Sequence, residues 1–204
     1  MPQLTQIKET KKGRLALFFD GEFAFSLDEE TFAKADLHVE DLLEDWQIED
    51  LRKQSDTRRA LDKAMDYLSL RDHAAGELYQ KLCRRFDEHS AAYAVARAGE
   101  LGLLNDADFA RRRAAELLRK RKSRRAILDD LTAKGIDRDT AAGAVEALYA
   151  DAEQDPELTA AIQLVQRHYA AKLAAGRRDQ VAAALARRGF SHAVIRQALE
   201  TDQT

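Results

Sequence analysis

Nine basic side chains lie within the fifteen residues from Arg111 to Arg125, and Glu116 is the only acid among them. Guanidinium and ammonium groups at this density suit ion pairing with phosphates or with clustered carboxylates. Most charge runs are solvated helix faces, yet nine bases against one acid exceed what solubility requires. We therefore interpret the run as an interaction surface. The residues expected to form it are Arg111, Arg112, Arg119, Lys120, Lys122, Arg124 and Arg125.

The other reactive residue types form no catalytic pattern. The chain has neither a GxxxxGK[ST] phosphate loop nor a GxGxxG turn. Its five histidines are scattered without metal-binding spacing, and the single cysteine, Cys83, has no histidine and acid partners that would make it a nucleophile. We therefore predict that the chain is not an enzyme, holds no metal and needs no cofactor.

Three consecutive helices between Leu101 and Tyr149 must position the basic run. Either Asn105 or Asp106 can cap the first helix, because both side chains accept a hydrogen bond from a free backbone N–H. A glycine stop at Gly135 ends the second helix. The first helix carries an apolar stripe of Ala110, Ala114, Leu117 and Leu118. Arg112 and Arg119 point away from this stripe and should be exposed.

Imperfect copies of this three-helix pattern lie before and after it in the sequence. Residues 76–86 correspond to residues 125–135 and again to residues 179–189. In that register the apolar positions coincide as Leu82, Leu131 and Leu185, and as Leu78, Ile127 and Val181. The register predicts a mainly helical fold of tandem three-helix repeats, each burying an apolar face partly on its neighbour. We expect repeats over 57–104, 105–150 and 151–204, after an N-terminal part over 1–56.

The N-terminal part differs in structure and charge. Residues 4–27 read as β-structure, and Asp20-Gly21 marks a hairpin turn because both residues tolerate positive φ. Phe23 and Phe25 should share one face of the sheet. A helix is expected from about Val39 to Gln54, before a separate helix that starts near residue 57. Residues 1–56 hold 7 basic and 14 acidic side chains, so the acidic excess lies here.

Composition limits the cellular setting. One cysteine excludes an internal disulfide and fits a reducing compartment. No apolar run approaches the roughly 20 residues of a membrane span, and the N-terminus lacks the apolar region of a signal peptide. We expect a cytoplasmic protein with no membrane partner.

Several of these segments resemble the RecX family of bacterial RecA modulators. The stretch RRALDKAMDYLSLRDHAAGELYQKLCRRF followed by ELGLLNDADFA resembles the family's first and second repeats. The continuation SRRAILDDLTAKGI is similar to the helix pair of the second repeat, and FFDGEFAFSLDEE to an N-terminal extension of many Gram-positive members. The resemblance is clearest from Ala60 to Leu148 and weakest after Asp155.

The resemblance implies an elongated, curved helical body that acts as a monomer. It implies binding along the groove of the RecA–DNA filament, where family members restrain filament growth or recombinase activity in DNA repair, homologous recombination and the SOS response. The expectation includes contact with single-stranded or duplex DNA inside that filament. It includes no catalytic residues. The alternative is a helix-turn-helix DNA-binding protein or transcription regulator. An acidic N-terminal part and an overall pI near 6.0 argue against a dedicated operator reader.

Overall fold

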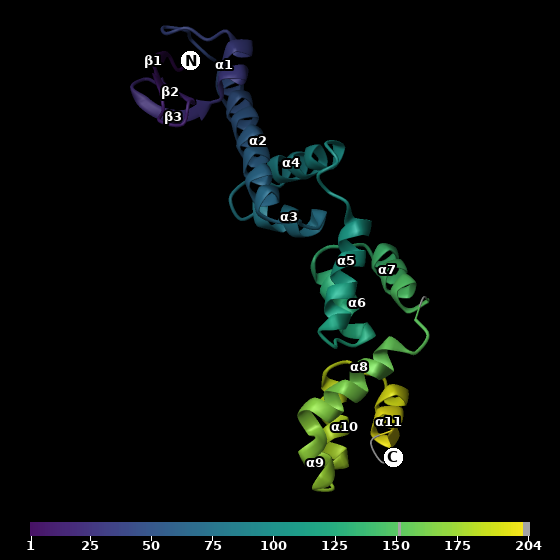
Figure 1. Ribbon diagram of the computed structural model, residues 1–204. Coiled ribbons are helices and arrows are strands. Elements are labelled where there is room, and N and C mark those ends of the chain that lie inside the picture. Colours follow the sequence, from purple (N-terminus) through teal and green to yellow (C-terminus); the bar gives the residue numbers. More distant parts are fainter. Residues whose placement is uncertain (151, 202–204) are drawn as a thin grey trace. The chain divides into compact units, whose positions relative to one another are not determined.

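A computed structural model describes residues 1–150 and 152–201, which form a small sheet followed by helices (Figure 1). The sheet contains β1 (Leu4–Glu9), β2 (Leu15–Phe19) and β3 (Glu22–Leu27), paired antiparallel in the order β1-β2-β3. Asp20 and Gly21 turn the β2–β3 hairpin with φ values of 49° and 85°, as the sequence predicts. The expected hairpin is therefore confirmed.

The two phenylalanines of β3 do not share a face, so that expectation was wrong. Leu17 pairs with Phe25 while the next residue, Phe18, pairs with Phe23, which leaves Ala24 as an extra residue in β3. Such a bulge reverses the alternation of side chains along a strand. Phe25 is therefore buried, whereas Phe23 is 61% exposed and packs edge-on against Phe18.

A single long helix joins the sheet to the helices that follow. The short helix α1 (Glu29–Ala35) precedes α2 (Asp45–Leu70), a helix of 26 residues. The expected break near residue 57 does not exist, because no glycine or proline interrupts the tract. Inside α2, the buried Ser55 donates a hydrogen bond of 2.6 Å to the Ser26 carbonyl and so ties the helix to β3.

The remaining described helices form the predicted tandem sets of three, so the mainly helical fold class is confirmed. The C-terminal half of α2 packs with α3 and α4, after which α5, α6 and α7 share a second core and the segments from α8 to α11 share a third. None of the helices in the described residues is long and apolar enough to cross a bilayer. Their bounds are α3 (Ala75–Leu82), α4 (Glu88–Glu100), α5 (Asp106–Arg119), α6 (Arg124–Ala133), α7 (Arg138–Ala150), α8 (Pro156–Leu164), the π-helical turn η1 (Val165–Tyr169), α9 (Ala170–Ala174), α10 (Arg178–Arg187) and α11 (His192–Thr201).

Burial supports the repeat register read from the sequence. The six aligned apolar side chains have no solvent exposure, and each triplet contributes one residue to each of the three cores. They are Leu78, Ile127 and Val181, and Leu82, Leu131 and Leu185. Equivalent burial at equivalent positions is what a stack of related helical sets requires.

The described chain divides into two compact units, and the division falls within α3. One unit comprises residues 1–73 and 78–104, and the other comprises residues 74–77 together with the chain from residue 105 onward. Residue 151, where the third repeat is expected to begin, lies outside the described residues.

Within the second unit, the start of α3 meets the end of α6 at a contact between two glycines. A Cβ atom on Gly76 would lie 2.6 Å from the Gly135 Cα, so neither position has room for a side chain. Asp106, at the start of α5, accepts a hydrogen bond of 2.8 Å from the Ala75 backbone N–H through Oδ1. An acid from the next three-helix set thus caps the first turn of α3.

The same arrangement recurs where the start of α6 meets the end of α10. A Cβ atom on Gly189 would lie 2.8 Å from the Ser123 Oγ, and that hydroxyl donates a hydrogen bond of 2.8 Å to the Arg188 carbonyl. Glu157, at the start of α8, accepts a bond of 3.2 Å from the Arg124 N–H. The start of α3 and the start of α6 therefore have the same local arrangement, which combines a close glycine contact and a capping acid.

Candidate functional site

The basic run occupies α5, the start of α6 and the tight connection between them. Asn105 caps α5, since its side chain accepts a hydrogen bond of 2.9 Å from the Asp108 N–H. Arg121 turns the chain with a φ of 57°, and Ser123 caps α6 through a bond of 3.1 Å from the Ala126 N–H. Buried alanines and Leu117 hold the opposite face of α5 against the core, so the cations of this helix surround an anchored scaffold.

Three predicted surface cations are already paired with acids on their own helix. Asp108 forms ion pairs with Arg111, with an Nη2–Oδ1 distance of 3.1 Å, and with Arg112, with an Nη2–Oδ2 distance of 2.8 Å. Lys120 pairs with Glu116 one turn away. The three cations are more than half exposed, so solvent screens the pairs, which weaken the positive field without removing it.

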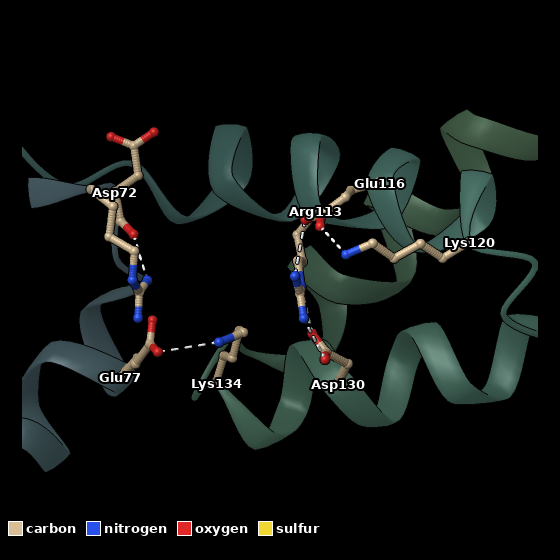
Figure 2. A network of polar contacts seen from close by, with 8 residues as sticks. Asp72, Glu77, Arg113, Glu116, Lys120, Asp130 and Lys134 are labelled. Carbon is tan, nitrogen blue, oxygen red and sulfur yellow. Dashed lines mark hydrogen bonds and ion pairs between the residues drawn. The ribbon is translucent and has the colours of Figure 1, made fainter.

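Arg113, although it belongs to the same run, is a structural residue. Its Nε and Nη2 donate to the two carboxylate oxygens of Asp130 on α6, each at 2.9 Å, and its Nη1 donates to Glu116 at 2.9 Å (Figure 2). These hydrogen bonds, chiefly those with Asp130, raise the pKa of Arg113. Lys120 first and Arg113 second lower the pKa of Glu116. The network fastens α5 to α6 and leaves Arg113 little freedom to bind a partner.

Arg119 and Lys122 are exposed cations that local structure does not neutralise. Neither forms an ion pair within the part of the chain that the structure describes. Arg121 also lacks an ion pair among the described residues, but it is half-buried and donates to the Gln163 side chain at 2.8 Å. Arg119 ends α5 and Lys122 follows the turn, so their charges project beside the α5–α6 connection. An uncompensated cation releases more counterions on meeting a phosphate than one that must first leave an acid.

Arg124 and Arg125 face a groove that the sequence did not predict. The groove has a volume of about 740 Å³ and runs between α6, α7 and the α10–α11 connection. Arg124 packs over the Tyr149 ring at 5.3 Å and lies 3.8 Å from Glu146, while Arg125 is 80% exposed and only 3.9 Å from Asp129. The charged residues and histidine that line it are Arg124, Arg125, Asp129, Arg138, Glu157 and His192.

Sequence reasoning missed Arg138 and His192 as members of this surface. Each directly follows a helix cap, Asp137 for α7 and Ser191 for α11, so both hold the first position of the third helix in their sets. The shared position is a signal that an alignment on helix caps could have detected. The groove therefore takes its lining residues from two successive three-helix sets, which a single helical wheel does not reveal.

Two residues that contact Arg124, namely Glu157 and Tyr149, place polar groups in buried surroundings. Glu157 is 8% exposed, and burial raises the pKa of its carboxyl against the opposing effect of the Arg124 N–H bond. Burial, together with the carboxylates of Glu157 and Asp155, raises the pKa of Tyr149 to about 12. The Tyr149 hydroxyl is buried without a hydrogen-bond partner in the described chain. No group of three or more histidine, cysteine, aspartate or glutamate side chains in that part of the protein could hold a metal ion.

Fold and site together define a class of protein: a small three-stranded sheet followed by tandem three-helix sets, with exposed cations concentrated on the second set. Two family models match the chain, one described as "RecX, first three-helix domain" over residues 60–97 and the other as "RecX, second three-helix domain" over residues 105–145.

Curated relatives and solved structures agree with these matches. The chain is 33% identical over 178 residues to the regulatory protein RecX of Lactobacillus gasseri, a match that covers 85% of this chain and 64% of that protein. It is 26% identical to the regulatory protein RecX of Bacillus subtilis, covering 98% of this chain and 77% of that protein. The chain belongs to the RecX family.

Solved structures support the fold independently. A crystal structure of regulatory protein RecX superposes with a TM-score of 0.69 at 20% identity, covering 98% of this chain and all of the other. RecX from Lactobacillus salivarius superposes with a TM-score of 0.61 at 21% identity, covering 72% of this chain and 97% of that one. At these identities the likeness concerns the fold alone.

Proposed function

We propose that this chain is a non-enzymatic regulator that binds the RecA–DNA filament and restrains filament growth or recombinase activity. The observation that carries the proposal is the concentration of exposed cations on α5 and α6, with Arg119 and Lys122 left without an ion pair among the described residues. Membership of the RecX family supplies the identity of the filament. Regulation of homologous recombination and of the SOS response follows from that partner.

Two physical roles fit the basic surface. It can meet carboxylates on the filament, where complementary charge accelerates encounter more than it increases affinity. It can also contact DNA phosphates inside the filament, which makes affinity fall as salt rises. In both roles a chain bound in the filament groove obstructs further filament assembly. Any decrease in ATP hydrolysis would be a decrease in the activity of the recombinase, not of this chain. We further propose that the chain works as a cytoplasmic monomer.

The experiment that tests this proposal is capture of the purified chain by RecA in defined states. The chain is incubated with RecA alone, with RecA assembled on single-stranded DNA in the presence of nucleotide, and with single-stranded or duplex DNA alone. Capture that requires the assembled filament, together with slower filament extension, is the expected result. Equal capture by bare duplex DNA, without a preference for the filament, would favour the helix-turn-helix alternative and overturn the proposal.

A further inference from the structure

The unit that carries the sheet contains a hollow unrelated to the basic surface. It has a volume of about 540 Å³ and lies between the end of α1, the segment 36–43 and the first turns of α2. Leu43 and Leu51 are buried in its floor, whereas Trp46 is 69% exposed and Leu42 is 57% exposed. Isolated exposed apolar residues are ordinary, but a tryptophan and a leucine at one hollow form a candidate anchor site, since tryptophan is enriched among binding hot spots.

The charge around this hollow is negative. Asp36, Asp41 and Asp50 line it, and none of them forms an ion pair within the part of the chain described. The one lysine in the lining, Lys34, is bound to Glu30 at 2.7 Å, so its charge does not balance the aspartates. The hollow thus combines an exposed apolar centre with an uncompensated acidic rim.

We propose that this hollow docks a basic amphipathic segment of a protein partner. Apolar side chains of the segment would cover Trp46 and Leu42, and its lysine or arginine groups would pair with the aspartates or lie over the indole ring. Phosphates are repelled by the aspartates, so nucleic acid and anionic lipid are unsuitable occupants. The chain then carries two surfaces of opposite charge on separate compact units, and the acidic surface goes beyond the function proposed for the basic one.

Trp46 makes the proposal directly testable, because it is the only tryptophan in the chain. The probe is a synthetic amphipathic helix of leucine and lysine, about four turns long, and the control is the same peptide with glutamate in place of lysine. Titration of the full chain with the lysine peptide should shift tryptophan emission to shorter wavelength and reach saturation. The glutamate peptide and a single-stranded oligonucleotide should leave the emission unchanged.

Two variants locate the binding without touching the core. Asp36→Asn combined with Asp50→Asn removes two rim charges, and asparagine suits the left-handed conformation at residue 36, whose φ is 48°. We expect this pair to weaken peptide affinity about threefold to tenfold. Leu42→Ser should weaken it about tenfold through loss of the apolar contact. Glu9→Gln combined with Glu22→Gln removes equal charge from exposed strand positions and should bind like the wild type.

Melting curves recorded by circular dichroism should coincide for all four proteins, since the substituted side chains are exposed. An absent emission shift, an equal shift with the glutamate peptide or the oligonucleotide, or unchanged affinity in both hollow variants would overturn the proposal. An emission shift that grows with the concentration of the chain alone, matched by dimers in sedimentation, would instead identify a second copy as the occupant and equally overturn it.

Discussion

The Arg113 guanidinium holds the Asp130 carboxylate at two points, with Nε–Oδ2 and Nη2–Oδ1 distances of 2.9 Å each. The contact joins α5 to α6 across seventeen residues of sequence, within a segment whose composition indicates a binding surface. Side chains on both sides are about one quarter exposed, so the pair is partly shielded from water. Paired, two-point hydrogen bonds of this kind are stronger and more directional than single ones.

Replacing Arg113 should therefore cost stability rather than binding. We expect Arg113→Ala to lower the free energy of unfolding by about 1–2 kcal/mol, because Asp130 loses both donors in a partly buried site. Arg113→Lys should recover only part of this loss, since an ammonium cannot reproduce the two-point contact. Urea denaturation measures both effects. Arg112→Ala is the matched control and should stay within about 0.5 kcal/mol of wild type.

The glycine contact between α3 and α6 should be intolerant of any side chain. Gly135 has a φ of 79°, and a Cβ atom there would lie 2.6 Å from the Gly76 backbone. Gly135→Ala should destabilise the fold by more than about 2 kcal/mol, from conformational strain and displacement of backbone. Gly143→Ala is the control, because that position is helical and open, and it should raise stability by about 0.5–1 kcal/mol. Similar denaturation midpoints for the two variants would show that the Gly76–Gly135 contact is loosely packed.

Leu131 should carry a large share of the second core. Its side chain is fully buried among α5, α6 and α7, so Leu131→Ala should cost about 2–5 kcal/mol. Leu185→Ala, at the equivalent place in the third core, should cost a similar amount. Helical sets that contact only their neighbours lose cooperativity when the middle one is damaged. Calorimetry of Leu131→Ala should therefore show a broadened or divided transition, and a single wild-type transition would contradict the expectation.

Glu157 should make stability fall as pH rises above the ordinary glutamate range. Burial raises its pKa in the folded chain above the unfolded value of 4.5, so the folded state binds more protons between those two values. The free energy of unfolding then decreases with pH across that window and levels off above the folded pKa. Glu157→Gln should remove this slope while keeping an acceptor for the Arg124 N–H. At neutral pH the variant should be at least as stable as wild type.

Chemical denaturation at a series of pH values measures the effect, with exposed Glu153→Gln as the control. A Glu157→Gln chain that is less stable than wild type at neutral pH would mean that the ionised carboxylate is favourable in this site.

Among the basic residues, Arg119 and Lys122, which form no ion pair in the described chain, and Arg125, whose contact with Asp129 is long and exposed, should dominate filament binding. Arg119→Ala combined with Lys122→Ala and Arg125→Ala should weaken affinity for the RecA–DNA filament several-fold and flatten its salt dependence, since fewer counterions are released. Arg111→Ala combined with Arg112→Ala should have a smaller effect, because Asp108 already neutralises part of those charges.

Anisotropy titrations at several salt concentrations give both quantities. A control with the same charge loss as the triple variant replaces Arg84, Arg85 and Arg196, which are exposed and do not belong to α5 or α6. If filament affinity depended on salt equally in the triple variant and in this control, the basic run would be only a solvated helix face.

The sequence by itself determined the helical character of the chain after the sheet and the buried positions of the repeats, although it wrongly divided α2 near residue 57. Apolar spacing in the segment from Ala110 to Leu117 depends on local geometry, because every 3.6 residues return to one face of a helix. The same periodicity placed Leu82, Leu131 and Leu185 in three separate cores and turned Arg112 and Arg119 toward solvent, as the structure confirms. Turn chemistry likewise predicted the hairpin at Asp20.

Only the tertiary structure decided which basic residues are free, because an ion pair depends on what a distant segment brings near. Asp130 holds Arg113 away from the binding surface, and helical periodicity, which turns Arg112 toward solvent, does not reveal that partner on α6. Arg138 and His192, which are 54 residues apart in sequence, line the same groove because two helical sets pack together. Periodicity carries no information on such non-local contacts, since they depend on how completed helices pack. Whether each cation of the basic run is paired or available for binding therefore depends on the tertiary packing.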